Sequence, residues 1–246
     1  MKNIWTIAKR EYDNYFNSPL AYVVALAIFL PVGGFFANLL LYGQQQALYG
    51  APPPDTNFLN LVFAFLMLFL SPAITMRLLS DEARMGTLEL LLTSPIRDFE
   101  LVAGKWLGAV LFVMTLVLVS LIYPIIFNNL VLPSIDYKLL LASYIALILM
   151  TTSLLGLGVG ISAIFSNQFA SFFISLGLFF MLWFVISFPA NFVSNGGGIF
   201  TYLSISEHFS SMNGGTINLG DVVYFLSLTA LGLFVGTTAI EIRRWR

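Results

Sequence analysis

The sequence predicts an all-α polytopic membrane protein, on three observations. Apolar residues make up 59% of the 246 and charged residues only 9%, and the mean hydropathy is +0.90. Soluble globular domains are typically about 45–50% apolar and about 25% charged. The apolar residues fall into six runs, each long enough for the roughly 20 residues that cross about 30 Å of hydrocarbon. The net charge of -1 and the absence of cysteine give no basis for nucleic-acid binding or for disulfide or thiolate-metal chemistry.

The first 18 residues predict a helix that lies in the membrane interface before the first span. Ile4, Ala8, Tyr12 and Tyr15 recur at helical spacing, with basic residues between them. Such a helix places its basic groups against lipid headgroups and its aromatic rings inward. The alternative is a frayed cytoplasmic tail, which the aromatic and basic periodicity disfavours.

Six spanning helices follow within a single transmembrane domain, residues 1–246. Their expected ranges are about 20–42, 58–79, 99–127, 137–165, 169–189 and 221–240. With the N-terminus inside, the basic residues lie on the cytoplasmic side except for Lys138, so both termini are expected in the cytoplasm and the chain in the cell (inner) membrane. Lys105 is expected to extend its ammonium to the interface beside Trp106. No ionisable residue is expected deep inside a span, which argues against an ion-coupled transporter.

A charged island, Arg77–Arg97, separates the second and third spans. Asp81 and Glu82 suit a helix N-terminus, leucines follow at i, i+3 and i+4 spacing, and Pro95 ends the pattern. The island therefore predicts an amphipathic helix over about 82–93, outside the bilayer. A solvated loop with a charged face is the alternative.

Two paired glycine motifs, Gly156–Gly160 in the fourth span and Gly232–Gly236 in the sixth, permit close approach of helices. Packing within one subunit is favoured over a seam between two subunits.

The run Asp81–Pro95, DEARMGTLELLLTSP, resembles the signature of ABC-2 type ABC-transporter permeases. Residues Ile7–Glu11 and Tyr15–Tyr22 are similar to the subgroup associated with gliding motility and with copper-enzyme maturation. The resemblance implies that the 82–93 helix is a coupling helix that docks on an ATPase subunit. It assigns docking to Glu82, Arg84, Gly86, Thr87 and Glu89, and packing of that helix to Leu88, Leu91 and Leu92.

The same resemblance implies a path between two subunits, lined by the second and fifth spans. The residues it places there are Ser71, Thr75, Phe172, Phe173, Phe179 and Phe180, and the aromatic rings are equally consistent with lipid contact. It also implies an external gate between the fifth and sixth spans, with Tyr202, Glu207, His208 and Phe209. As the only histidine, His208 is expected to be a surface or capping residue, and no metal site is expected.

The function that follows is the permease subunit of an ATP-driven exporter, without catalytic residues of its own. Gly104-Lys105 resembles the end of a phosphate-binding loop, but Phe99 and Trp106 stand where that loop needs Gly and Ser or Thr. ATP and Mg²⁺ are therefore expected in a separate cytoplasmic ATPase. Further expected partners are a second permease subunit, identical or related, membrane lipid, and an auxiliary periplasmic or extracellular protein. The alternatives are a component that turns ATPase motion into mechanical or assembly work, and an ATP-independent channel or scaffold.

Overall fold

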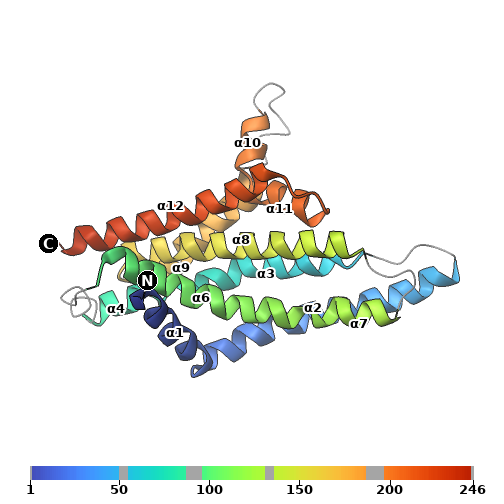
Figure 1. The fold of residues 1–246 in the computed structure, drawn as a ribbon, viewed down its shortest axis with the longest axis horizontal. Coiled ribbons are helices and arrows are strands. Elements are labelled where there is room, and N and C mark those ends of the chain that lie inside the picture. The colour runs from blue at the N-terminus through green and yellow to red at the C-terminus, as the bar shows by residue number, and fades with distance from the viewer. Residues whose placement is uncertain (1, 50–54, 87–95, 131–135, 187–196, 245–246) are drawn as a thin grey trace.

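The computed structural model describes residues 2–49, 55–86, 96–130, 136–186 and 197–244, and this part of the chain is helical with no strand. The elements are α1 (Lys2–Phe16), α2 (Pro19–Leu48), α3 (Asn57–Thr75), α4 (Ser80–Arg84), α6 (Asp98–Ser120), α7 (Ile122–Leu130), α8 (Tyr137–Ile164), α9 (Gln168–Phe180), the π-helical turn η1 (Met181–Val185), α10 (Gly197–Leu203), α11 (Ile205–Asn213) and α12 (Leu219–Arg244). The predicted all-α class is confirmed (Figure 1).

Within the part of the chain that the structure describes, six segments are long and apolar enough to cross a membrane, as the sequence predicts. They are Pro19–Gln45, Asn57–Arg84, Asp98–Leu130, Tyr137–Ile164, Gln168–Val185 and Leu219–Arg244. The third is not one continuous helix, because α6 ends at Ser120 and α7 begins at Ile122. Pro124 in the first turn of α7 has no N–H to bond back to Ser120, which accounts for the break. The described part of the fifth span ends at residue 186, so its expected end at 189 lies outside the described residues.

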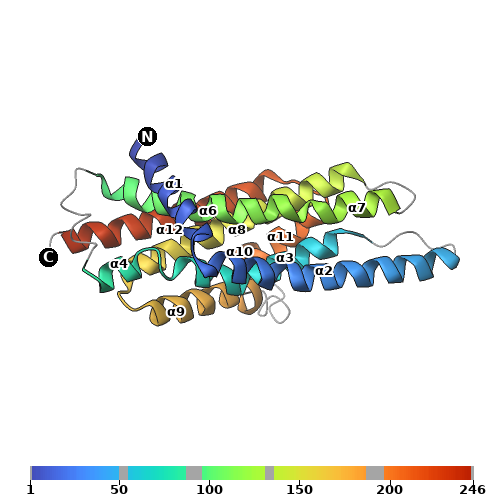
Figure 2. The ribbon, with the colours of Figure 1, turned by 90° about the horizontal axis from the view of Figure 1, so that it is seen from below.

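The helix bundle has two distinct ends (Figures 1 and 2). One, here called the α4 end, carries α1, α4, the start of α6 and the C-terminal end of α12. The other, the α11 end, carries α7, α11 and the C-terminal end of α2. Both termini lie at the α4 end, as an even number of spans requires.

Helix α8 runs through the centre of the bundle and packs against α12 over much of its length. A Cβ on Gly160 would collide with the carbonyl of Gly232, and one on Gly156 would lie 3.2 Å from the backbone of Thr229. The two glycine motifs therefore join α8 and α12 of the same chain. Their predicted packing within one subunit is confirmed.

Helix α1 crosses α6 by a second close approach. A Cβ on Gly104 would lie 2.8 Å from the Cβ of Ile7, and one on Gly108 would lie 2.9 Å from the carbonyl oxygen of Ala8. Ala8 is fully buried in this crossing. The predicted N-terminal helix thus forms, but one face of it is part of the bundle rather than merely resting in the interface. Gly104-x-x-x-Gly108 is the sequence signal for this crossing, and it was not among the predicted packing motifs.

Candidate functional site

The chain leaves α3 through a short turn that is anchored to α8. The backbone N–H groups of Leu79 and Ser80 donate to the hydroxyl of Ser162, at 3.2 and 3.1 Å. The Ser80 hydroxyl in turn donates to the Ser162 carbonyl oxygen at 2.9 Å. Ser80 and Ser162 are both fully buried. Because the first N–H groups of a helix lack partners within it, Ser162 fixes where α4 begins.

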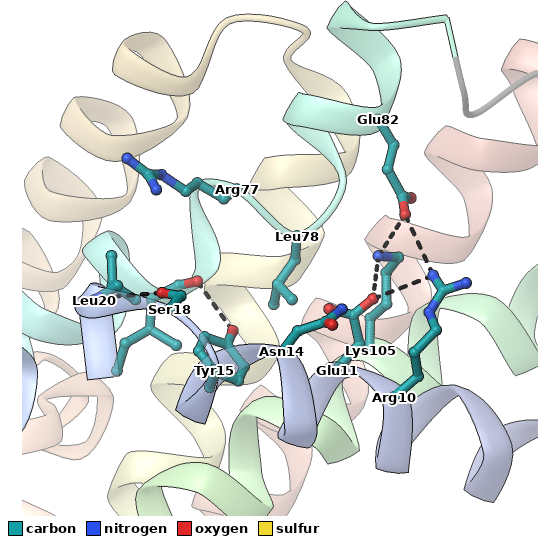
Figure 3. Close-up of a pocket in the computed structure, with 11 residues that line it drawn as sticks. Arg10, Glu11, Asn14, Tyr15, Ser18, Leu20, Arg77, Leu78, Glu82 and Lys105 are labelled. Carbon is teal, nitrogen blue, oxygen red and sulfur yellow. Dashed lines mark hydrogen bonds and ion pairs between the residues drawn. The ribbon is translucent and has the colours of Figure 1, made fainter. Parts of the chain in front are cut away.

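A buried lysine joins α4 to two further helices. Lys105 Nζ on α6 lies 2.8 Å from Glu82 Oε1 on α4 and 2.8 Å from Glu11 Oε1 on α1. The lysine side chain is 2% exposed. Figure 3 shows Glu82 reaching from α4 toward the ammonium that Glu11 approaches from the other side. Glu11, Glu82 and Lys105 are called the charge triad below.

Arg10 covers the open side of the charge triad, 3.6 Å from Glu11 and 3.9 Å from Glu82. Its side chain is 58% exposed, so its ion pairs are expected to contribute less than about 1 kcal/mol. Lys105 is different because its charge is withdrawn from water. Removing one partner of a buried pair typically costs about 3–5 kcal/mol, since the remaining charge is left uncompensated. The triad therefore holds three helices in one arrangement.

A cleft of about 280 Å³ opens beside the charge triad, between α1 and the turn into α4. At its base the Tyr15 hydroxyl donates to the carbonyl oxygen of Ile74 at 3.2 Å. Burial, and to a smaller extent the Glu11 carboxylate, raises the pKa of Tyr15 above its ordinary value, which keeps the hydroxyl a donor. Arg77 lines the cleft but points away from the triad (Figure 3). The charge triad, with its charges paired, thus lies on one side of the cleft, and the exposed guanidinium of Arg77 lies on the other.

Helix α4 is shorter than the predicted coupling helix. It ends at Arg84, which lies 3.6 Å from Asp81, and Gly86 has a φ of +72°, a left-handed conformation that ends helices. The expectation of one uninterrupted helix over about 82–93 is therefore wrong at Gly86. The remaining residues of that expectation, Thr87, Leu88, Glu89, Leu91 and Leu92, lie outside the described residues.

The C-terminal end of α12 is tied to the same end of the bundle. Arg244 forms an ion pair with Asp98 at the start of α6, at 2.7 Å. Arg243 donates to the carbonyl oxygen of Ile164 at 2.9 Å, where α8 ends. Helices α1, α4, α6, α8 and α12 are thus all connected by polar contacts at the α4 end.

A comparison with protein families matches residues 5–240 to the model described as the ABC-2 family transporter protein. The chain belongs to the ABC-2 transporter family. Members of this family are membrane permease components of ABC transporters, not themselves catalytic; they generally work with a cytoplasmic ATPase and often dimerise. The comparison with curated proteins found no match. The likeness to the gliding-motility and copper-enzyme-maturation subgroup stays a prediction.

The predicted position of the Lys105 side chain in this ABC-2 chain is wrong. Lys105 does not extend to the interface; its ammonium is buried between two carboxylates. Neither Glu11 nor Lys105 was expected to belong to the site. An acidic residue in the N-terminal helix and a lysine inside a predicted span were the available signals, but their pairing depends on how α1 crosses α6.

The six residues assigned to a translocation path do not meet on one surface of the described ABC-2 chain. Ser71 and Thr75 on α3 are buried, and their hydroxyls donate to carbonyl oxygens of their own helix. Phe179 is fully buried, whereas Phe173 is exposed and packs edge-on against Phe172. The path assignment stays a prediction.

Phe180 belongs instead to an aromatic cluster between the second and fifth spans. Its ring lies 5.1 Å from that of Phe69 and 5.4 Å from that of Phe184. Phe65 and Phe184 line an apolar groove of about 470 Å³. Residues of α2, α3 and η1 form its walls. This groove lies between parts of the second and fifth spans, the two spans that the family resemblance assigns to the path between two subunits.

At the α11 end, His208 is buried, so its expected surface position is wrong, whereas the expected capping role fits its contact with the last turn of α10. Its Nδ1 lies 2.6 Å from Asp221 Oδ1, its Nε2 lies 2.7 Å from the carbonyl oxygen of Tyr202, and its ring stacks on Tyr224 at 4.0 Å. Because a carbonyl oxygen only accepts, Nε2 carries a hydrogen. The short contact between His208 Nδ1 and Asp221 Oδ1 is then a hydrogen bond with one proton between these two atoms. The lone histidine fastens α11 to α10 and α12.

The other predicted gate residues separate into buried and exposed ones. Phe209 is fully buried and packs near Trp183, whereas Tyr202 and Glu207 are exposed. Asp221, which sequence reasoning missed, also accepts hydrogen bonds from Ser211 and Asn218. No group of three or more metal-ligating side chains occurs among the residues that the structure describes.

Proposed function

We propose that this ABC-2 chain is the permease of an ATP-driven exporter and that α4 receives the motion of a cytoplasmic ATPase. The observation that supports this most is the buried charge triad, which joins α4 to α1 and α6. The hydrogen bonds between Ser80 and Ser162 join the same short helix to α8. A force applied to α4 therefore reaches three neighbouring helices directly.

The charge distribution supports a cytoplasmic location for α4. The α4 end carries most of the basic side chains of the described chain, namely Lys9, Arg10, Arg77, Arg84, Arg97, Lys105, Arg243 and Arg244, whereas Lys138 starts α8 at the opposite end. Basic residues concentrate on the cytoplasmic side of multi-pass proteins. ATP and an ATPase would meet the chain on that side.

In the mechanism we propose, the ATPase displaces α4, and the helices in contact with α4 move with it. Arg84 and Met85 are exposed beyond the anchored first turn, so a partner can contact them without disturbing the triad. ATPase closure would move α4, and the fixed contacts would carry α6 and α8 with it. Because α8 packs against α3, α9, α11 and α12, its tilt would reach the α11 end. Docking by Arg84, Gly86, Thr87 and Glu89 is part of this proposal.

Co-purification tests the partner assignment. The chain purified alone is expected to bind no nucleotide and hydrolyse no ATP, and to co-purify with the ABC ATPase of its transporter when both are expressed. An Arg84→Glu variant should weaken the complex, because the exposed cation is reversed, while Asp55→Asn at the α11 end should not. ATP turnover by the isolated chain, or failure to associate with any ABC ATPase, would contradict the proposal.

A further inference from the structure

A second groove, on the outside of the bundle, lies where α1 crosses α6. It has a volume of about 430 Å³. Leu111, Met114 and Leu118 of α6 form an apolar floor, and the rings of Trp5 and Tyr12 on α1 stand beside it. The Tyr12 hydroxyl shares a hydrogen bond of 3.2 Å with Thr115, which fixes that ring against α6.

The groove is open toward the surroundings of the bundle. Leu118 is 61% exposed and Trp5 is 58% exposed. Leu118 belongs to a candidate membrane span and α1 precedes the first span, so the floor of the groove lies within a span and its α1 wall lies before the first one. Uncovered apolar side chains at that depth face lipid chains, while an exposed tryptophan is typical of the interface.

Two opposite charges form the polar rim of this groove. Lys9 and Asp13 are both exposed and are four residues apart on α1, so their side chains stand side by side on one face of the helix, about 5–6 Å apart at Cβ. Neither forms an ion pair with another side chain of the described chain, in contrast to Arg10 and Glu11 beside them. A cation and an anion are therefore both available to a ligand.

We propose that the groove binds a phospholipid whose headgroup carries both a phosphate and a primary ammonium. Lys9 pairs with the phosphate, Asp13 accepts hydrogen bonds from the ammonium, and one acyl chain lies along Leu111, Met114 and Leu118. A quaternary ammonium has no N–H to donate to Asp13. An uncharged glycerol headgroup leaves the anionic phosphate beside Asp13 without a compensating cation. The rim thus selects phosphatidylethanolamine over phosphatidylcholine and phosphatidylglycerol.

The test uses the full chain, purified in detergent and delipidated. Phosphatidylethanolamine, phosphatidylcholine or phosphatidylglycerol with brominated acyl chains is titrated in, and quenching of tryptophan fluorescence is compared with that of Trp5→Phe to isolate Trp5. We expect the tightest binding for phosphatidylethanolamine. Asp13→Asn should weaken it roughly tenfold, the loss typical of a charge-assisted hydrogen bond, and should improve phosphatidylglycerol binding. Lys9→Gln should weaken all three lipids, and Asp55→Asn should change none.

Exchanging the charges of Lys9 and Asp13 distinguishes loss of lipid recognition from a general folding defect. The double variant Lys9→Asp with Asp13→Lys keeps both charges on the same helix face, so it should recover phosphatidylethanolamine preference that either single reversal loses. Equal affinity for the three lipids would overturn the proposal. So would absence of bromolipid quenching at Trp5, which would indicate that a second protein surface covers the groove. Neither result would affect the association with an ATPase.

Discussion

At the scale of single residues, Lys105 carries the largest energetic consequence. Its ammonium lies between Glu11 and Glu82 and is almost completely removed from water. Either carboxylate can be lost while the other still pairs with the lysine. Loss of the lysine, however, leaves two carboxylates facing each other in a partly buried site. The three members of the triad are therefore not equivalent.

This asymmetry predicts the order of three variants. Lys105→Met should lower the free energy of unfolding by about 3–5 kcal/mol, whereas Glu82→Gln should lower it by about 1–3 kcal/mol, because Glu11 still compensates the lysine. Lys138→Gln, an exposed lysine at the other end, is the control and should change it by less than about 0.5 kcal/mol. Denaturant unfolding of the purified chain measures all three. A Lys105→Met chain as stable as the Lys138→Gln chain would mean that the triad does not hold the helices.

The buried pair of His208 and Asp221 predicts a local effect at the α11 end. Asp221 accepts from His208, Ser211 and Asn218, so Asp221→Asn removes a charge-assisted contact from each. Hydrogen exchange over α11 should become faster in this variant. Glu207→Gln, an exposed change on the same helix, should leave exchange unchanged. Equal exchange in both variants would show that the histidine pair does not fasten α11.

At the scale of elements, the bundle contains two helix crossings at which glycines allow the backbones to approach closely. One joins α8 to α12 and the other joins α1 to α6. The second crossing is a condition for the charge triad, because it brings Glu11 to Lys105. A side chain at Gly108 would meet the Glu11 Cβ and the Ala8 carbonyl oxygen, both of which belong to α1.

Matched glycine substitutions test this dependence. Gly108→Ala should push α1 away from α6 and destabilise the chain by about 1–3 kcal/mol, the usual cost of overpacking. Gly34→Ala in α2 is the control, since nothing lies within 4 Å of a Cβ there, and it should be neutral or slightly stabilising. A crosslink between cysteines placed at Asn3 and Glu100, which are hydrogen-bonded at 3.0 Å, would report the position of α1. Efficient crosslinking in the Gly108→Ala chain would contradict the expected displacement.

Elements were easier to predict from the sequence than contacts between them. Length and hydropathy are properties of contiguous residues, so the six spans and the N-terminal helix could be predicted directly. The break at Gly86 could not, because glycine at that position fits both a helix interior and a left-handed end. The partners of Lys105 and His208 lie on other elements and depend on packing. Burial of these two polar residues was therefore missed.

At the scale of the whole molecule, most of the described Lys and Arg side chains lie at the α4 end, which also holds both termini. Since the chain has no cysteine, single cysteines can report orientation. Met85→Cys, exposed after α4, should react only with a thiol reagent that crosses the membrane. Gln45→Cys, exposed near the end of α2, should react with an impermeant reagent added outside. The reverse pattern would place α4 outside the cell and remove its role in ATPase coupling.

The central claim is that motion received at α4 passes to α6 through the charge triad and to α8 through the Ser80–Ser162 contact, and so reaches the α11 end. Spin labels at Gln45→Cys and Ser210→Cys, both exposed at that end, give one distance within the chain. In the complex with its ATPase, trapping with a non-hydrolysed ATP analogue should shift this distance. Adding Glu82→Gln should reduce the shift while the ATPase stays bound, and adding Asp55→Asn should leave it intact. A full shift in the Glu82→Gln complex would contradict the account.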